Sequence, residues 1–199
     1  LIVSGYIGID VWFTNQEVKQ VTATDGRNSD EEGKDESKIS SKTVDDYNVA
    51  PDLPRVLSIP SQVVKARVLQ MAVKTNNQLK APLNIYDAGW YMGSAKPGNY
   101  GAILIDGHVS GPTQSGVSKN IKSLQQGDII KLDNGAKQEF SYKVDKVETV
   151  LEGEVDMTKM LQPYKAGGKG LNLITCGGKF DSKTQTYDSR TLVYTTQVE

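Results

Sequence analysis

The chain has 199 residues, and its 23 Lys and Arg residues nearly balance 24 Asp and Glu residues for a net charge of −1. The lack of a basic block argues against a nucleic-acid binder. The length allows a stable hydrophobic core without disulfide or metal cross-links. The only Cys cannot form an internal disulfide, and with the only His it cannot complete a closed four-ligand zinc site from those residue types.

The first thirteen residues, LIVSGYIGIDVWF, are mostly apolar but include Asp10. This run is shorter than the roughly 20 residues that a helix needs to cross a bilayer. Because the chain starts with Leu1 and places Trp12 where an interfacial aromatic would lie, we interpret residues 1–20 as the remnant of an N-terminal membrane anchor. The alternative is a strand or a docked amphipathic segment.

The next segment, residues 21–54, has the composition of an acidic flexible linker. Residues 21–50 carry eight acidic against four basic side chains and few large apolar ones. Such a segment buries too little apolar surface to offset the entropy of ordering, so we expect a solvated tether. The PDLP sequence at 51–54 then precedes the folded domain, and a chain starting near Asp52 is expected to keep its fold and activity.

Residues 55–199 form the predicted folded domain and contain short apolar runs separated by Gly, Pro, Asn and Asp. Several of these runs alternate with period two, including GAILIDG, EFSYKVDKVETV and RTLVYTTQV. Short β-rich runs at this spacing favour a mostly-β barrel or sandwich over a layered α/β fold. Helix is expected only in short pieces, within residues 119–126 and 156–164.

The single thiol lies at an unusual place for a structural cysteine. Cys176 follows an apolar run and precedes two glycines in LITCGGKF. His108 has the same placement in AILIDGHVSGP, just after an apolar strand and a glycine. An imidazole near a thiol favours the nucleophilic thiolate, although a lone His is more often a surface or core residue.

Arg190 is the third candidate, because it opens the last predicted strand, RTLVYTTQV. If strands 170–176 and 190–197 pair as a hairpin, Arg190 and Cys176 lie at the same end of the sheet. A guanidinium there would stabilise an oxyanion formed by attack of the thiolate on an amide. The alternative is a solvated edge-strand charge.

Together these motifs resemble the sortase family. LITCGG around Cys176, GHVSGP around His108 and the Arg at the start of the terminal strand follow the order of the three sortase signatures. The segment AGWYMGSAKPGNYGAILIDGHVSGP, residues 88–112, is most similar to class F sortases, whereas the Cys176 to Arg190 spacing is closer to class A. The resemblance covers residues 55–198.

This resemblance implies a closed eight-stranded β-barrel with short helices and a cysteine transpeptidase. The enzyme would cleave an LPXTG-like sorting signal after its threonine and join the acyl product to an amine. Cys176 would be the nucleophile, His108 the general acid and base, and Arg190 the oxyanion or peptide ligand. Thr175 and Gly177 would support the substrate or oxyanion.

The resemblance also implies the partners. They would be the sorting-signal peptide of a surface protein and an amine acceptor from a peptidoglycan precursor or another surface protein. The enzyme would be a single-pass membrane protein with an extracellular catalytic domain. A thiol hydrolase with the same residues, or a non-catalytic surface binding module with an inert Cys176, remain alternatives.

No cofactor is expected, and the other features allow more than one interpretation. Glu152, Glu154 and Asp156 would bind calcium if the acidic loop resembles that of some class A members, but a solvated loop is the simpler interpretation. Trp90 and Tyr91 would line a peptide groove or pack in the core. Gly177 and Gly178 would let backbone approach the thiol, or simply turn the hairpin.

Overall fold

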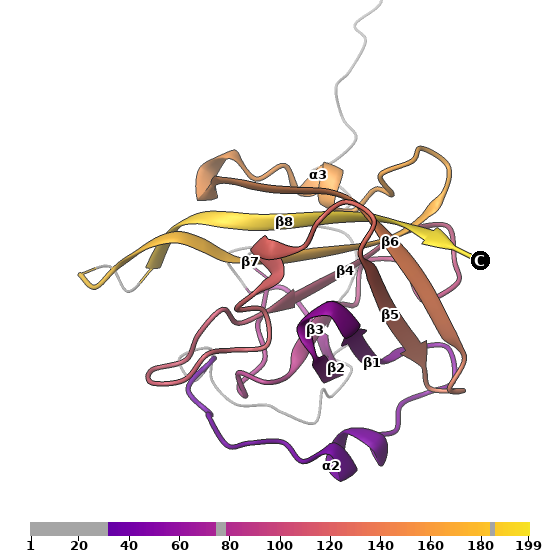
Figure 1. Cartoon of the computed structure of the whole chain (residues 1–199), viewed down its shortest axis with the longest axis horizontal. Helices are drawn as coiled ribbons and strands as arrows, with labels where there is room; N and C mark the ends of the chain where they lie inside the picture. The colour runs from indigo at the N-terminus through magenta and orange to yellow at the C-terminus, as the bar shows by residue number, and fades with distance from the viewer. Residues whose placement is uncertain (1–31, 75–78, 184–185) are drawn as a thin grey trace, which may run out of the picture.

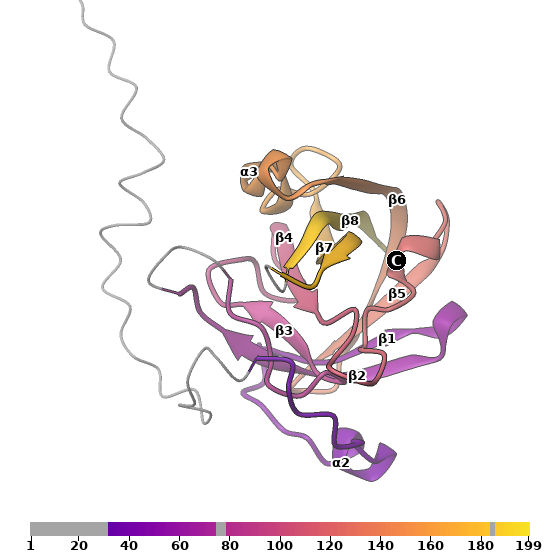
Figure 2. The same ribbon diagram turned by 90° about the vertical axis from the view of Figure 1, so that its left-hand side faces the viewer.

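The computed structural model describes residues 32–74, 79–183 and 186–199, and its strands form one closed barrel (Figures 1 and 2). The strand order around the barrel is β1-β2-β3-β4-β7-β8-β6-β5. The expected mostly-β, closed eight-stranded fold is therefore confirmed. The strands are β1 (Pro54–Ile59), β2 (Val64–Met71), β3 (Ala88–Tyr91), β4 (Gly101–Gly107), β5 (Ile129–Asn134), β6 (Glu139–Leu151), β7 (Lys169–Asp181) and β8 (Thr186–Val198).

The alternating side chains of the strands produce two apolar clusters. On β4, Ile103 and Ile105 point into the barrel, where they join the main core with Leu171 and Leu173 of β7. The intervening Leu104 belongs to a second cluster with other side chains of the opposite face. That second cluster covers the outer face of β4, β7 and β8, and comprises Leu104, Met160, Ile174, Leu192 and Tyr194.

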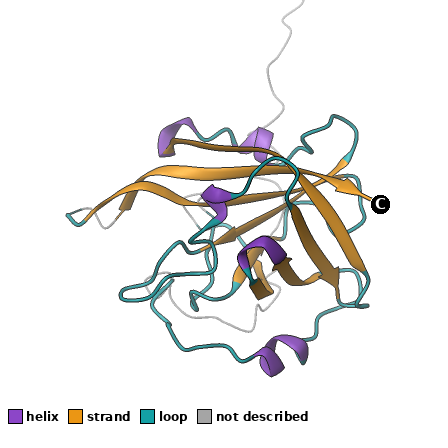
Figure 3. Ribbon diagram, in the orientation of Figure 1, coloured by secondary structure: helices purple, strands orange, loops and turns teal. Residues whose placement is uncertain are grey.

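Helices are short, as expected, and lie before β1 or in the connections between strands (Figure 3). The expected helix within 156–164 is α3 (Met157–Met160), which Asp156 caps by accepting from the Lys159 N–H at 3.2 Å. The segment 119–126 forms only the 3₁₀ turn η3 (Ile121–Ser123). The remaining pieces are α2 (Ser41–Asp45), η2 (Pro60–Gln62) and η4 (Glu152–Glu154).

The β7–β8 hairpin is longer than predicted. The two strands pair antiparallel as expected, but β7 continues past Cys176 to Asp181 and β8 begins at Thr186. The pair therefore projects beyond the barrel at one side (Figure 1). Gly178, at φ +75°, lies where the register shifts between Gly177 and Phe180, so this glycine accommodates a bulge and does not turn the hairpin.

Residues 32–53, called here the N-terminal arm, pack on the barrel. The Gly33 N–H donates to Pro82 O at 3.1 Å, and Asp35 exchanges backbone hydrogen bonds with the 83–85 segment. Val44 of α2 is only 4% exposed, and the Tyr47 hydroxyl donates to Val68 O at 3.1 Å. For this part of the chain, the expectation of a flexible linker over 21–54 is corrected, because backbone pairing and a buried apolar anchor hold it.

The remaining N-terminal predictions concern residues that the structure does not describe. The anchor remnant predicted for residues 1–20 and the linker residues up to 31 lie outside the described ranges. In the part of the chain that is described, no helix is long and apolar enough to cross a membrane. The anchor therefore stays a prediction.

Removing the arm should destabilise the barrel. A chain starting at Asp52 loses the burial of Val44, about 2 kcal/mol, together with several hydrogen bonds of about 1 kcal/mol each. We expect its melting temperature to fall by roughly 5–15 °C relative to a chain starting at Glu32. Equal melting temperatures in a thermal scan would show that the arm contributes nothing to stability.

Candidate active site

Cys176 lies on the outer face of β7, in the middle of the sheet. Leu171 and Leu173 point into the barrel, so alternation places Ile174 and Cys176 on the opposite face. Cys176 is a free, half-buried thiol. Its partner across the antiparallel pair is Arg190, so the hairpin places the two side chains next to each other, as the sequence predicts.

The parallel pairing of β4 with β7 places His108 beside the same position. Asp106 pairs with Ile174, and one residue further along, the Thr175 hydroxyl donates to Gly107 O at 2.5 Å. His108 follows Gly107 at the end of β4, just as Cys176 follows Thr175. The three predicted catalytic residues thus lie on β7, on β8 and directly after β4, which are neighbours in the barrel.

Thr175 itself has a structural contact. Its side chain is 5% exposed and its hydroxyl is bound to Gly107 O, on the side opposite Cys176. The hydroxyl that the sequence analysis offered to the substrate is therefore engaged in joining β7 to β4. Gly177 lies against β8, where a Cβ would come within 2.8 Å of Thr191 Oγ1, so only glycine fits without movement.

The His108 ring is enclosed by backbone atoms of two other segments of the chain. Its Nε2 lies 2.7 Å from Pro82 O, so this nitrogen carries the proton that the carbonyl accepts. Gly33 of the arm covers the ring, because a Cβ there would lie 2.8 Å from His108 Cε1. This burial lowers the pKa of His108, although the Pro82 carbonyl acts in the opposite direction.

The thiol is also kept in its neutral form. Burial raises the pKa of Cys176, while the positive charge of Arg190 lowers it and the carboxyl groups of Glu152 and Asp106 raise it. Because burial opposes the charged form of both groups, we expect a weakly coupled pair and not a strong thiolate–imidazolium ion pair.

Arg190 has a fixed orientation. Its Nη1 donates to Tyr187 O at 3.1 Å and to Ser189 O at 2.9 Å. Its Nη2 forms an ion pair with Glu152 of η4. These contacts hold a positive charge beside the thiol, where an attacked carbonyl oxygen would become negative.

The arrangement of a nucleophilic thiol, an imidazole and a guanidinium at neighbouring strand positions suits acyl transfer. The family model for the sortase domain matches residues 57–198. The chain belongs to the sortase family. As a sortase, it is a cysteine transpeptidase. Among curated proteins, no match to the sequence is found.

Solved sortase structures share this fold. Sortase C of Streptococcus pneumoniae superimposes with a TM-score of 0.58 at 18% identity, covering 83% of this chain and 75% of its own. The pilus-related sortase C of Group B Streptococcus gives 0.58 at 21%, covering 86% and 81%. A Clostridium perfringens sortase D5 transpeptidase gives 0.54 at 19%, covering 79% and 86%. The closer likeness to class F expected from residues 88–112 is not supported by these comparisons.

Sequence reasoning did not single out Asp106. Its Oδ1 is buried without a hydrogen-bond partner, and burial raises the pKa of this carboxyl well above its ordinary value. The signal was present in AILIDGH, because period-two alternation puts Leu104, Asp106 and His108 on one face of β4. An acid in an otherwise apolar run, two residues before the candidate imidazole, marks a position beside the site.

The acidic side chains of this loop have separate environments. Glu152 pairs with Arg190, Asp156 caps α3, and Glu154 is exposed. In the described ranges, no group of three or more His, Cys, Asp or Glu side chains is placed to hold a metal ion. Calcium binding by Glu152, Glu154 and Asp156 stays a prediction.

The two candidate groove aromatics have different environments. Trp90 is 2% exposed in the barrel interior and donates from Nε1 to Ala95 O at 3.1 Å, so it is a core residue. Tyr91 is half-buried against the outer cluster with Leu104 and Ile174. Of the two, only Tyr91 shares the face of Cys176.

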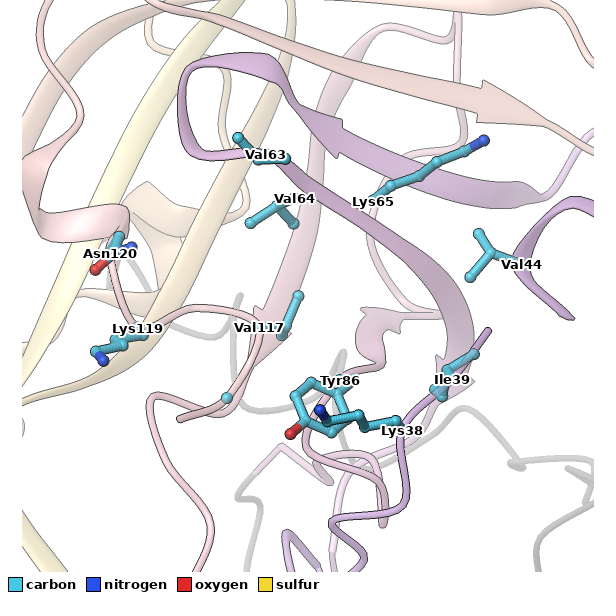
Figure 4. Close-up of a pocket in the computed structure, with 11 residues that line it drawn as sticks. Lys38, Ile39, Val44, Val63, Val64, Lys65, Tyr86, Val117, Lys119 and Asn120 are labelled. Atoms are coloured by element: carbon cyan, nitrogen blue, oxygen red, sulfur yellow. The ribbon is translucent and has the colours of Figure 1, made fainter. Parts of the chain in front are cut away.

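A cavity of about 380 Å³ lies next to the loop that follows His108 (Figure 4). It is lined by the arm, the start of β2 and the loop after His108, with Val64, Tyr86 and Val117 among Lys38, Lys65 and Lys119. None of Cys176, His108 and Arg190 lines it. The cavity is thus not part of the candidate active site.

The shifted pKa of the thiol predicts its reactivity with pH. Because burial raises the Cys176 pKa above the ordinary value of about 8.5, little thiolate is present below neutrality. Alkylation by iodoacetamide should be slow at pH 6 and still rising above pH 8.5. His108→Ala should keep the shape of this profile, since the imidazole does not set the thiol pKa. A fast, flat rate down to pH 5 would contradict weak coupling.

The bond between Thr175 and Gly107 should be needed to hold His108 in place. Thr175→Val keeps the shape of the side chain but leaves Gly107 O without its donor, which lowers the free energy of unfolding by about 1–2 kcal/mol. We expect a lower melting temperature and a transpeptidation rate reduced about tenfold or more, because misplaced groups react slowly. Thr175→Ser retains the hydroxyl and should retain both properties. Equal values for the Val and Ser variants would refute this role.

Proposed function

We propose that this sortase cleaves an LPXTG-like sorting signal after its threonine and joins the acyl product to an amine at the cell surface. The observation that carries the proposal is the pairing of Cys176 on β7 with Arg190 on β8, with His108 directly after the adjacent strand β4. Their roles follow from the chemistry of each group. The sorting signal, the acceptor and the location are expectations from the family.

In the first half-reaction, the Cys176 thiolate attacks the threonine carbonyl carbon and forms a C–S bond. The carbonyl oxygen becomes an oxyanion, which Arg190 stabilises with the positive charge held beside the thiol. The C–N bond then breaks, and the imidazolium form of His108 gives its proton to the leaving amine. A thioacyl-enzyme and a free amine result.

In the second half-reaction, neutral His108 takes a proton from the incoming amine as that amine attacks the thioester. The C–S bond breaks, the Cys176 thiolate leaves, and a new amide forms. The raised pKa of Cys176 and the lowered pKa of His108 make the thiolate–imidazolium form a minority species. The rate should follow a bell in pH whose limbs belong to the coupled pair.

The partners we propose are the sorting peptides of surface proteins and an amine from a peptidoglycan precursor or another surface protein. The membrane would be reached through the N-terminal anchor predicted for residues 1–20. The similar S. pneumoniae enzyme is described in terms of pilin substrate specificity, and that of Group B Streptococcus as pilus-related. These relatives support a surface-protein substrate for this chain.

The test incubates the protein with a pool of LPXTG-like peptides and a simple amine such as triglycine, and reads the products by mass. We expect a peptide cleaved after threonine and joined to the amine. Cys176→Ala should abolish the thioacyl-enzyme, His108→Ala should lower turnover, and Arg190→Ala should lower it about 100- to 1,000-fold. Turnover by the Cys176→Ala variant would contradict the proposal.

The same assay separates the other functions. Cleaved peptide with no amine product, at any amine concentration, would indicate a thiol hydrolase with the same three residues. No cleavage, together with a thiol that resists alkylation under native conditions, would indicate a binding module.

A further inference from the structure

Arg190 is held by more contacts than a surface arginine usually makes. Two backbone carbonyls of its own strand, Tyr187 O and Ser189 O, accept from Nη1. The carboxylate of Glu152 accepts from Nη2. The Arg190 side chain is 19% exposed and that of Glu152 is 46% exposed, so the guanidinium is the more enclosed partner.

These contacts leave part of the guanidinium available. An arginine has five N–H donors, of which the two carbonyls and Glu152 take three. Among the described residues, the Nε–H and the second Nη2–H of Arg190 have no partner. Arg190 can therefore keep its three present contacts and still donate to an oxygen of a bound peptide.

Glu152 comes from an element outside the β7–β8 hairpin. It opens η4, directly after β6, whose last paired residues lie beside the start of β8. Leu151 pairs with Ser189 and Val150 with Arg190, so the β6–β8 register brings the Glu152 carboxylate to the guanidinium. The β6–β8 pairing thus positions Glu152, and the Arg190–Glu152 ion pair does not depend on loop conformation alone.

We propose that Glu152 is a positioning residue of this sortase: it fixes Arg190 beside Cys176 and offsets the guanidinium charge until a substrate binds. The inference rests on the proposed function for its effect on turnover. Its effect on the free thiol does not depend on any substrate.

The effect of the Glu152 charge on the pKa of Cys176 has a definite direction. The ionisable groups acting on Cys176 are Arg190 from β8, Glu152 from η4 and Asp106 from β4. Arg190 lowers the thiol pKa, whereas Glu152 and Asp106 raise it. Removing the Glu152 charge therefore leaves the guanidinium less compensated, and the thiolate should form at lower pH than in the wild type.

Two substitutions separate charge from position. Glu152→Gln removes the charge but keeps an oxygen that can accept from Arg190, whereas Glu152→Ala removes both. The matched control is Glu154→Gln, which removes an equal charge from the same 3₁₀ turn at an exposed side chain that is not among the groups acting on the Cys176 pKa.

The first measurement is the pH profile of iodoacetamide alkylation in the full chain without peptide. Glu152→Gln should move the profile to lower pH and alkylate severalfold faster at pH 7.5. Glu152→Ala should give a smaller shift, because the released guanidinium also acts more weakly on the thiol. Glu154→Gln should match the wild type. Arg190→Ala should move the profile to higher pH. A profile unchanged by Glu152→Gln would overturn the proposal.

The second measurement is kcat and KM for transpeptidation. Glu152→Ala should lower kcat about ten- to hundredfold, since a misplaced guanidinium loses transition-state contacts, while Glu152→Gln should keep most of kcat. A faster thiol in Glu152→Gln combined with slower turnover in Glu152→Ala is a pattern that general destabilisation does not produce, and melting curves check folding. Wild-type kcat in Glu152→Ala would overturn the positioning role.

The two proposals fail in different ways. If the wild type joins no peptide to an amine, the proposed function fails, but the alkylation profiles still decide whether Glu152 controls the charge at Cys176. If the wild type turns over normally and Glu152→Ala behaves like Glu154→Gln in both measurements, only the role of Glu152 is wrong.

Discussion

The pairing of β7 with β4 on one side and β8 on the other is the constraint on which the site depends. Neighbouring strands lie about 4.7–4.9 Å apart, so residues at one level of three adjacent strands are necessarily close. The Cys176–Arg190 register and the Thr175–Gly107 hydrogen bond place thiol, guanidinium and imidazole at that level. Side-chain hydrogen bonds between β7 and β8, such as Thr195 Oγ1 to Leu171 O at 2.6 Å, hold the same register further along.

Burial and charge act against each other at this level. Enclosure by neighbouring segments disfavours both the thiolate and the imidazolium, so each group rests in its neutral form. The positive charge of Arg190 lowers the pKa of Cys176 and so favours the thiolate, whereas the carboxyl group of Glu152 raises this pKa. A resting enzyme with a protonated thiol resists nonspecific alkylation and oxidation, whereas a bound peptide would meet donors that are already oriented.

The N-terminal arm shows where composition misleads. The acidic residues that indicate a linker have specific partners on the barrel: Glu36 accepts from the Thr113 N–H and the Gln114 N–H, each at 2.7 Å. One buried valine and these contacts order a segment whose average hydrophobicity is too low to predict it. Composition reports the mean of a segment, but a few placed contacts decide whether that segment packs.

The sequence by itself determined the strand-rich fold and the identity of the three candidate residues. Period-two alternation is a local property, and a chain with one Cys and one His offers few choices for a thiol–imidazole pair. The Arg190–Glu152 ion pair, 38 residues apart, and the His108–Pro82 contact, 26 residues apart, were decided only by the tertiary structure. The length of the β7–β8 hairpin and the burial of Asp106 belong with them. Such contacts join segments that no local periodicity relates, so only barrel closure and its register bring them together.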